Sequence, residues 1–360
     1  MLVAQVISTV LAVSIWSASG VVWAATQAPA PAPPAPQLAP GHVESHPQYD
    51  PSGQQAASIQ ALTSVGSDLV YAGSFGLGLF RSEDRGINWT KSGQGVTDPF
   101  ILTLTTGKDG AIYAGTFRGG VFRSRDRGTS WQAINSGLKH LEIKALLAVR
   151  DGVYAGTAGG VYRLSAADRW SVVTTGLDDI LVHALALSSD GTLFAGTSGK
   201  GILRFKAQSA GWVRERQGLK DHEGMTENFI RVVTIDPDGG IYAGTFDGGV
   251  FCSADGGMTW RPISRALPND SIRGILFNSR GLFVATGHGI FKTTDKGRQW
   301  VPLNKGLTSM AIQVLIESGA GVLYAGTSDG AFRSDDDGRT WNPINQGLEG
   351  GQAPAPFHFR

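Results

Sequence analysis

The sequence predicts an all-β fold, a single seven-bladed β-propeller of four-stranded antiparallel blades. An aromatic residue followed by small residues recurs seven times, at successive intervals of 42, 41, 40, 48, 41 and 41 residues. These aromatics are Tyr71, Tyr113, Tyr154, Phe194, Tyr242, Phe283 and Tyr324. A Trp follows each one, at Trp89, Trp131, Trp170, Trp212, Trp260, Trp300 and Trp341. A period of about 40 residues, with strand-like runs and Gly-rich turns inside each copy, is typical of propeller blades.

Each repeat contains four expected strands. A short apolar run forms the innermost strand A and begins at Ile59, Ile101, Ile143, Val182, Ile230, Ile272 and Ile312. Strand B is the Tyr-Ala-Gly-Thr run, whose small residues let neighbouring blades approach closely. Strand C follows a Gly-rich hairpin, and strand D follows the Trp. Because the first and last copies are complete, we expect the first and seventh blades to close the ring by packing; an outer strand from residues 42–58 is the alternative.

Strand C runs into an octet with the pattern Ser-x-Asp-x-Gly-x-x-Trp. Five copies begin at Ser82, Ser124, Ser253, Thr293 and Ser334. The Asp is expected to accept N–H groups of the turn, the Gly to adopt a positive φ, and the Trp to pack on the sheet. The structural carboxylates are then Asp84, Asp126, Asp255, Asp295 and Asp336. Residues 164–170 and 205–212 keep the Trp but lose the pattern, so different turns are expected there.

This octet resembles the Asp-box, or BNR repeat, of sialidases, two-propeller xyloglucan hydrolases, sortilin-type receptors and photosystem II assembly factors. The resemblance covers residues 58–350 and implies a propeller, but the shared motif is a structural turn and does not choose a function. In layout the chain is most similar to the non-enzymatic assembly factors.

Enzymatic relatives make demands that these residues do not meet. A sialidase would need an Arg-Ile-Pro type motif ahead of the first octet, whereas Arg261-Pro262-Ile263 has another order and follows an octet. A sialidase also needs a Tyr nucleophile. No tyrosine here is a candidate for it, because those within the repeats fill strand positions and Tyr49 precedes the repeats. The xyloglucan hydrolases place their carboxylates between two propellers, and one propeller fits here. We therefore expect no catalytic residue, no metal and no cofactor.

The residues before the repeats predict export. Residues 1–25 carry no charged side chain, are apolar enough for a signal peptide or membrane anchor, and end in a small-residue cleavage pattern at Ala24 and Ala25. No Lys or Arg precedes the apolar run, so an uncleaved inner-membrane tether is the alternative. Residues 26–57 form a Pro-rich spacer, 58–350 the propeller and 351–360 a C-terminal tail. The protein is expected in the periplasm or outside the cell.

Charge and cysteine content exclude some partners. The formal net charge of +1 gives no global case for nucleic acid. The lone Cys252 occupies a strand C site where the other copies carry a cation: Arg81, Arg123, Arg163, Arg204, Lys292 and Arg333. We interpret Cys252 as a structural residue, and the cations as stems packed between blades with paired heads.

The second residue of strand A is expected near the mouth of the central channel. The seven copies supply Gln60, Leu102, Lys144, His183, Arg231, Arg273 and Gln313. Lys144, Arg231 and Arg273, with the titratable His183, would focus positive potential on an anionic group or acidic partner segment. The alternative is a polar channel lining bonded to carbonyls and waters.

Two other features lie on the same face. Phe75, Phe117 and Phe246 stand at the tips of the longer hairpins between strands B and C, and would suit protein or sugar binding unless they fold back between blades. Residues 220–228 expand one connection and contain His222, Glu223 and Glu227, which match no defensible metal signature. Asp178 and Asp179 lie on the preceding connection.

Together these features predict an exported, non-catalytic binding or assembly scaffold for a protein partner in the cell envelope, with an acidic segment as its ligand. The membrane would be contacted only through an uncleaved N-terminal segment. A carbohydrate-active enzyme using Glu223 and Glu227 and a glycan-binding module are the alternatives.

Overall fold

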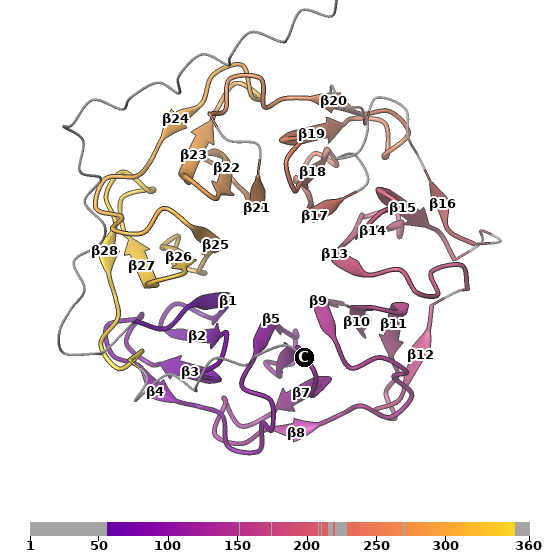
Figure 1. Cartoon of the computed structure of the whole chain (residues 1–360), viewed down its shortest axis with the longest axis horizontal. Coiled ribbons are helices and arrows are strands. Elements are labelled where there is room, and N and C mark those ends of the chain that lie inside the picture. The colour runs from indigo at the N-terminus through magenta and orange to yellow at the C-terminus, as the bar shows by residue number, and fades with distance from the viewer. Residues whose placement is uncertain are drawn as a thin grey trace, which may run out of the picture. The chain divides into compact units, whose positions relative to one another are not determined.

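The computed structural model describes residues 56–349, apart from 151, 174, 208, 210, 215–218, 220–228, 269 and 270. In this part of the chain the backbone forms seven four-stranded sheets, each made of four strands that are consecutive in the sequence. The sheets stand around a central axis as blades, with one edge strand of each nearest the axis (Figure 1). The predicted fold class is therefore confirmed.

Strand A begins in every blade at the residue that the sequence indicated. Its copies are β1 (Ile59–Val65), β5 (Ile101–Thr106), β9 (Ile143–Val149), β13 (Val182–Leu187), β17 (Ile230–Ile235), β21 (Ile272–Asn278) and β25 (Ile312–Glu317). Strand B, which carries the repeated aromatic, comprises β2 (Leu69–Ser74), β6 (Ile112–Thr116), β10 (Gly152–Thr157), β14 (Leu193–Thr197), β18 (Ile241–Thr245), β22 (Gly281–Thr286) and β26 (Leu323–Thr327).

The outer two strands are shorter. Strand C comprises β3 (Leu79–Ser82), β7 (Val121–Ser124), β11 (Gly160–Leu164), β15 (Ile202–Phe205), β19 (Val250–Ser253), β23 (Gly289–Thr293) and β27 (Gly330–Ser334). Strand D comprises β4 (Thr90–Lys91), β8 (Gln132–Ala133), β12 (Trp170–Val172), β16 (Val213–Arg214), β20 (Arg261–Pro262), β24 (Val301–Pro302) and β28 (Asn342–Pro343). Because neighbouring strands are antiparallel, the B–C hairpins and D–A connections share one face, the loop face, and the octet turns lie on the other, the octet face.

The small residues of strand B allow the blades to approach closely. A Cβ added at Gly326 would lie 2.7 Å from Cγ2 of the fully buried Ile59, across the junction that closes the ring, and 2.7 Å from Cγ1 of Val314. Gly115, Gly156 and Gly196 are crowded by the first residue of the next strand A in the same way. In blade six the two strands exchange residue types: Ala285 of strand B stands at the Gly position, and the strand A residue paired with it is Gly274. In every blade, this pair of strand A and strand B residues therefore contains one glycine.

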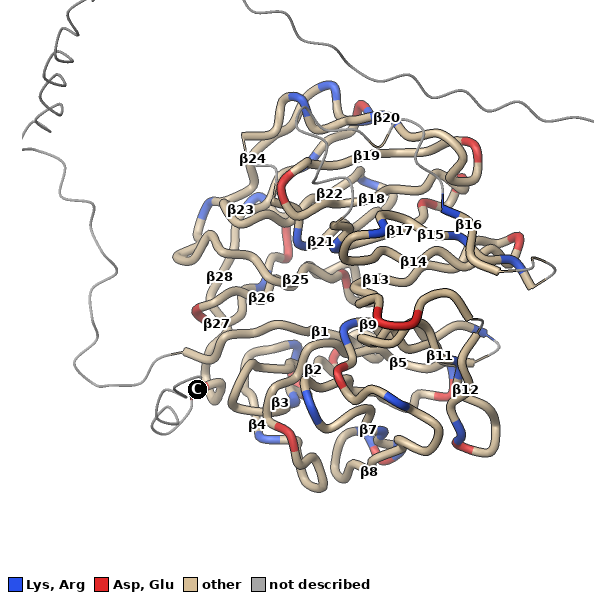
Figure 2. Tube along the Cα trace, turned by 45° about the vertical axis from the view of Figure 1, so that its right-hand side comes forward, with Lys and Arg blue, Asp and Glu red and all other residues tan. Residues whose placement is uncertain are grey.

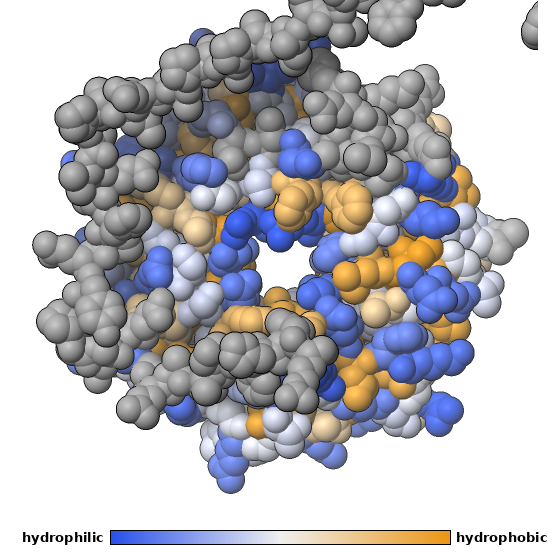
Figure 3. Space-filling model, in the orientation of Figure 1, coloured by the Kyte–Doolittle hydropathy of each residue, from blue (hydrophilic) through white to orange (hydrophobic). Residues whose placement is uncertain are grey.

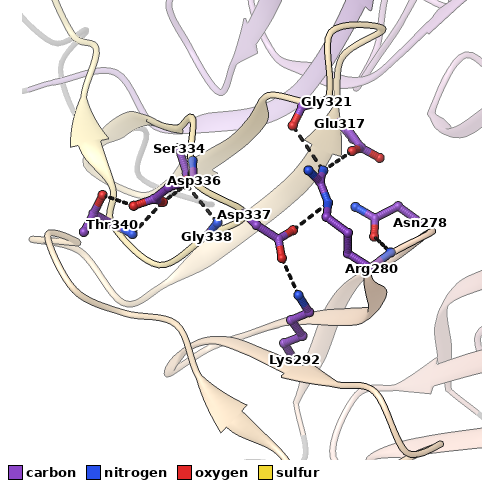
Figure 4. A network of polar contacts seen from close by, with 10 residues as sticks. All are labelled: Asn278, Arg280, Lys292, Glu317, Gly321, Ser334, Asp336, Asp337, Gly338 and Thr340. Atoms are coloured by element: carbon purple, nitrogen blue, oxygen red, sulfur yellow. Dashed lines mark hydrogen bonds and ion pairs between the residues drawn. The ribbon is translucent and has the colours of Figure 1, made fainter.

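The octet turn is held by its Asp. In blade seven, Oδ1 of Asp336 accepts hydrogen bonds from the Thr340 N–H at 2.9 Å and the Ser334 hydroxyl at 2.8 Å, while the Ser334 Oγ accepts the Gly338 N–H at 2.8 Å (Figure 4). Hydrogen bonds from Thr340 lower the pKa of Asp336 to about 2. Both Asp337 and Gly338 have positive φ, so the turn needs two left-handed residues in succession. The same backbone acceptance occurs at Asp84, Asp126, Asp255 and Asp295.

In five blades of the described chain the indole N–H of the repeated Trp bonds to the preceding blade, whereas that of Trp260 bonds to Gly257 of its own blade. The indole N–H of Trp341 donates to the Leu303 carbonyl of blade six at 2.9 Å, and that of Trp170 donates to the Ile134 carbonyl of blade two at 2.6 Å. At the ring junction, Trp89 of blade one donates in the same way to Ile344 of blade seven at 2.8 Å. These side chains therefore bridge blades as well as packing on a sheet.

Within the described residues, closure uses no exchanged strand. Every sheet consists of its own four consecutive strands, and blades one and seven share a hydrophobic cluster that contains Ile59, Tyr324 and Leu348. An isolated bridge pairs Ala56 with Glu349 beside this cluster. The two ends of the described chain thus meet at the junction, which agrees with the expected packing of the first and seventh blades.

The eroded turn of blade three has a different role. Arg123 of strand C in blade two is 5% exposed, and its guanidinium forms a bidentate ion pair with Asp168, with Nη2 2.7 Å from Oδ2. This hydrogen bonding raises the pKa of Arg123 and lowers that of Asp168. Asp168 adopts a φ of 55° in a turn that has lost the octet pattern. The altered turn of blade three therefore supplies the carboxylate that pairs with the buried Arg123 of blade two.

A second charge network joins blades six and seven. Asp337 accepts the Lys292 ammonium on one oxygen, and its other oxygen lies 2.9 Å from Nε of Arg280 (Figure 4). The Arg280 guanidinium also contacts Glu317 and the Gly321 carbonyl. The strand C cation Lys292 of blade six therefore pairs its head with Asp337 in the octet turn of blade seven, as the sequence indicated for the heads of these cations.

Several expectations concern residues that the structure does not describe. The signal peptide or anchor at 1–25, most of the Pro-rich spacer at 26–57, and the tail at 351–360 lie outside the described residues. His222, Glu223 and Glu227 also lie outside them. Within the described part of the chain, no helix is long and apolar enough to cross a membrane.

Candidate functional site

The channel collar is formed by one residue from each strand A. It comprises Gln60, Leu102, Lys144, His183, Arg231, Arg273 and Gln313, and every member is half-buried. In each blade the register between strands A and B shifts at this residue, which is the additional residue of a β-bulge. A bulge redirects a side chain, and the preceding residue is fully buried between blades. Figure 3 shows an open central channel with hydrophilic side chains around most of its rim.

The collar is charged along one arc only. Lys144, His183, Arg231 and Arg273 belong to blades three to six, which follow one another around the ring. Figure 2 marks basic positions near β9, β17 and β21. Gln313, on blade seven, accepts a hydrogen bond from Nη1 of Arg273 at 2.6 Å and so orients this guanidinium. The remaining arc carries amide and apolar side chains.

The charged members perturb one another. Burial, followed by the charges of Lys144 and Arg231, lowers the pKa of His183 to about 4, so its imidazole is neutral at pH 7. Its Nε2 lies 2.6 Å from the Ser198 Oγ. Burial and the neighbouring Arg273 lower the pKa of Arg231, and burial lowers that of Arg273. At neutral pH the arc therefore holds three permanent cations.

Counter-charges are sparse at the collar. Lys144 pairs with Glu142 at 2.9 Å. Neither Arg231 nor Arg273 forms an ion pair within the described part of the chain. Two adjacent, partly desolvated guanidinium groups that lack a carboxylate are a ready seat for an anion.

The three predicted aromatics fall into two groups. Phe75 and Phe117 both lie near Phe100, with ring centroids 4.8 Å and 6.5 Å from it respectively. Phe246 belongs to blade five, where its N–H donates to the carbonyl of Phe229. Phe75 is 48% exposed and Phe246 is 53% exposed, so neither folds back between blades.

Backbone hydrogen bonds fix these hairpins on the D–A connections. The Phe117 N–H donates to the Phe100 carbonyl at 3.0 Å, and the preceding Thr116 closes its hairpin through its hydroxyl on Gly120 at 3.0 Å. Thr245 does the same on Gly249 ahead of the blade five aromatic. The side chains of the loop face are therefore presented by a braced backbone.

Collar cations stack on hairpin aromatics. The Arg231 guanidinium lies 4.9 Å from the centroid of Phe246, and the Lys144 ammonium lies 5.6 Å from that of Phe117. Arg118 also lies over Phe117, at 5.0 Å. Such contacts stabilise a cation's position without neutralising it. The collar and the aromatics, predicted as separate features, thus form one surface.

Four residues of this surface were missed in the sequence. Phe100 and Phe229 stand immediately before strand A, a position that the other blades fill with Ser58, Glu142, Leu181, Ser271 and Ala311. Blade four also has the longer hairpin, with Ser198 at the position of Phe75, Phe117 and Phe246. Arg118 follows Phe117. An aromatic preceding strand A was the available signal for the first two.

Within the part of the chain that the structure describes, no hydrogen bond, ion pair or ring contact joins the other candidate residues to this surface. Asp178 and Asp179 are exposed in a turn, where Asp179 has a φ of 62°. Cys252 is buried, and burial raises its pKa, which disfavours a reactive thiolate. Among the described residues, no three or more His, Cys, Asp or Glu side chains are grouped so as to hold a metal ion.

Comparisons with known proteins agree with this architecture. The model of the BNR-Asp box repeat family matches residues 79–92, which comprise strand C, the octet and strand D of blade one. No curated protein matches the chain.

Solved propellers of low identity share the fold. YCF48 from Cyanidioschyzon merolae is 15% identical with a TM-score of 0.60, over 77% of this chain and 94% of that one. An extracellular domain from B. thetaiotaomicron, described as part of a hybrid two component system, is 15% identical with a TM-score of 0.63, over 77% of this chain and 39% of that one. A streptogramin B lyase is 12% identical with a TM-score of 0.63, over 78% and 93%. This chain spans less than half the length of three extracellular-domain chains that it matches, which are described as parts of putative one component or hybrid two component systems.

These structures have different roles on one fold. At such identities the likeness shows the architecture alone, and it includes an enzyme as well as an extracellular domain. The function of this chain must therefore be inferred from its own site.

Proposed function

We propose that this chain is an exported, non-catalytic binding scaffold whose channel collar receives an acidic segment of a protein partner in the cell envelope. One observation carries the proposal. Arg231 and Arg273 lie side by side at the channel mouth, partly buried, and neither has a carboxylate partner in the described part of the chain. A carboxylate from outside would supply the missing charge.

The energetics favour an anionic ligand. A hydrogen bond to a charged group contributes about 1.5–3 kcal/mol, and a carboxylate can bond to two guanidinium groups at once. Burial and, after it, repulsion by Arg273 lower the pKa of Arg231, and a bound carboxylate would relieve this repulsion. Gln313 and Phe246 already hold the two guanidinium groups in place, so less side-chain entropy is lost on binding.

The mechanism is passive recognition by a rigid surface. The hairpins are braced by Thr hydroxyls and by backbone hydrogen bonds, so the binding groups are in position before the ligand arrives. A propeller of the same fold, YCF48, has been solved bound to D1 peptide, which supports peptide recognition as a role for this architecture. The apolar segment at residues 1–25 supports export.

Fluorescence anisotropy with labelled Asp- and Glu-rich peptides tests the proposal. The variants are Arg231→Glu and Arg273→Glu, with Arg298→Glu, an exposed residue of an octet turn, as the matched control. We expect each collar variant to weaken binding at least ~10-fold, which corresponds to about 1.4 kcal/mol, while the control changes affinity little. Binding should also weaken as salt is raised.

Equal effects of the three reversals would refute a collar site. Turnover on a glycan panel that is lost in Glu223→Gln or Glu227→Gln would favour the carbohydrate-active enzyme instead. Saturable glycan binding without turnover, unaffected by the collar variants, would favour a glycan-binding module.

A further inference from the structure

We infer that the bound segment is amphipathic, with an acidic side chain seated at Arg231 and Arg273 and an aromatic or large aliphatic side chain seated on Phe75 and Phe100. This inference rests on the proposed function and adds the chemistry of the partner. It follows from the unequal halves of the loop face.

The collar itself is divided. Its cations occupy blades three, five and six, whereas blades seven, one and two contribute Gln313, Gln60 and Leu102. Figure 3 shows apolar side chains at the channel rim over the blades that contain β1 and β5. A ligand that was acidic throughout would leave this part of the rim without a complementary partner.

Among the described residues, Phe75 and Phe100 form a ring pair that carries no cation; Phe229, 47% exposed in blade five, also carries none but belongs to no described ring pair. Phe117 and Phe246 each have a cation over the ring, and within the described residues no such contact involves Phe75 or Phe100. The two rings tilt by 60° against each other, and a backbone bridge joins their residues. A fixed, half-exposed ring pair is a suitable seat for one apolar side chain.

A groove adjoins this ring pair. Its volume is about 440 Å³, and its lining includes Leu77, Val96 and Pro99. In the sequence, Leu77 lies two residues after Phe75, and Pro99 directly precedes Phe100. The Pro99 carbonyl accepts hydrogen bonds from the hairpin N–H groups of Gly76 and Gly78. A partly apolar surface therefore continues beyond the two rings, with Lys91 and Gln94 also lining the groove.

One segment can engage both halves, because both lie on the loop face. Phe75 and Phe246 each follow strand B and bond through their N–H to the residue before strand A of their own blade. The partner segment must then pass over the channel mouth. An extended chain advances ~3.3 Å per residue, so its two anchor side chains should be separated by several residues.

Three peptide sets test the inference by fluorescence anisotropy on the full chain. One set carries Asp and Glu in a Gly/Ser background, one carries Trp or Phe without acids, and one carries both with spacers of about two to about eight residues. We expect the combined peptide with the best spacer to bind at least ~10-fold tighter than the acidic peptide, because it also buries a large apolar side chain.

Variants assign each anchor to its seat. Phe75→Ser should reduce the affinity of the combined peptide to that of the acidic one, and should leave the acidic peptide unaffected. Phe75→Trp should retain tight binding. Ile87→Ser, which removes an equally exposed apolar side chain from the octet face of the same blade, is the control and should change neither affinity. Thermal unfolding of each variant verifies that it folds.

The results separate this inference from the proposed function. If the acidic peptide binds as tightly as the combined one, or Phe75→Ser has no effect, the amphipathic ligand is refuted while an acidic ligand remains. If Arg231→Glu changes no peptide affinity, the proposed function fails as well.

Polygalacturonate, an acidic polysaccharide, tests whether the ligand is a carbohydrate. If it binds more tightly than any peptide, the inference that the ligand is a protein segment is refuted. The C-terminal tail contains two aromatic residues, Phe357 and Phe359, that could compete for the apolar seat. If Phe357→Ser and Phe359→Ser tighten peptide binding, this tail is the natural occupant of the seat, and the inference is overturned.

Discussion

Replacing Gly326 with Ala should destabilise the propeller, because the blades meet too closely there for a side chain. The added Cβ would lie 2.7 Å from Cγ2 of Ile59, 2.7 Å from Cγ1 of Val314 and 2.8 Å from the Ile59 carbonyl oxygen. Favourable carbon contacts are about 3.5–4.0 Å, so three atoms must move by roughly 1 Å, and one of them belongs to the backbone. Overpacking of a core costs about 1–3 kcal/mol, and we expect a loss of about 2–3 kcal/mol.

Gly274 provides the matched control. It lies in strand A of blade six, and a Cβ added there would meet its nearest atom, Cβ of Ala285, at 3.4 Å. Gly274→Ala should therefore change the free energy of unfolding by less than about 1 kcal/mol, with a gain expected from the restricted unfolded chain. Urea unfolding monitored by Trp fluorescence measures both variants. Equal losses for the two would refute the argument that close approach of the blades requires the glycine.

Further predictions concern charged side chains. Asp336 has a folded-state pKa of about 2 against 3.8 otherwise, so it stabilises the fold above pH 3.8 and loses this contribution as the pH falls toward 2. Asp336→Asn should flatten the acid-unfolding curve in that window, and an unchanged curve would contradict the octet role. Asp337→Asn retains a residue that tolerates positive φ but removes the charge between Lys292 and Arg280; urea unfolding should show a loss of about 1–2 kcal/mol, reduced by partial exposure. His183 has a pKa of about 4 against 6.5, so stability should fall as the pH is lowered through this range, because the unfolded chain binds the proton first. NMR titration that gives an ordinary pKa for His183 would contradict its burial between cations.

The architecture could be predicted because each blade repeats the same local rules. The first residue of strand A is apolar in all seven copies, and every observed strand A begins there. The octet combines a capping hydroxyl, a carboxylate and a glycine within a few residues, so its geometry is determined locally. The additional left-handed residue, directly before the Gly of the turn, was not predicted, since residues as different as Lys296 and Asp337 occupy it.

Contacts between blades could not be predicted in the same way. Asp168 lies in the turn of blade three that lacks the octet pattern. It contacts Arg123 only because blades two and three pack against each other. Lys144 likewise stacks on Phe117 of the preceding blade, whereas Arg231 stacks on Phe246 of its own. Such pairings depend on the rotation between neighbouring sheets, which a repeat period does not specify.

The collar combines features that the repeat predicts with features that depend on packing. Its seven positions were assigned from periodicity, but the bulge that presents them depends on the pairing of strands A and B. The low pKa of His183 depends on burial and on neighbouring blades. The contact of Phe75 with Phe100 and that of Phe246 with Arg231 became visible only in three dimensions.

A crystal structure of the chain with the tightest-binding acidic peptide would test the central claim most directly. The account predicts a ligand carboxylate within hydrogen-bonding distance of the guanidinium groups of Arg231 and Arg273, on the loop face at the channel mouth. A peptide bound on the octet face, or on the loop face with both guanidinium groups unoccupied, would contradict it.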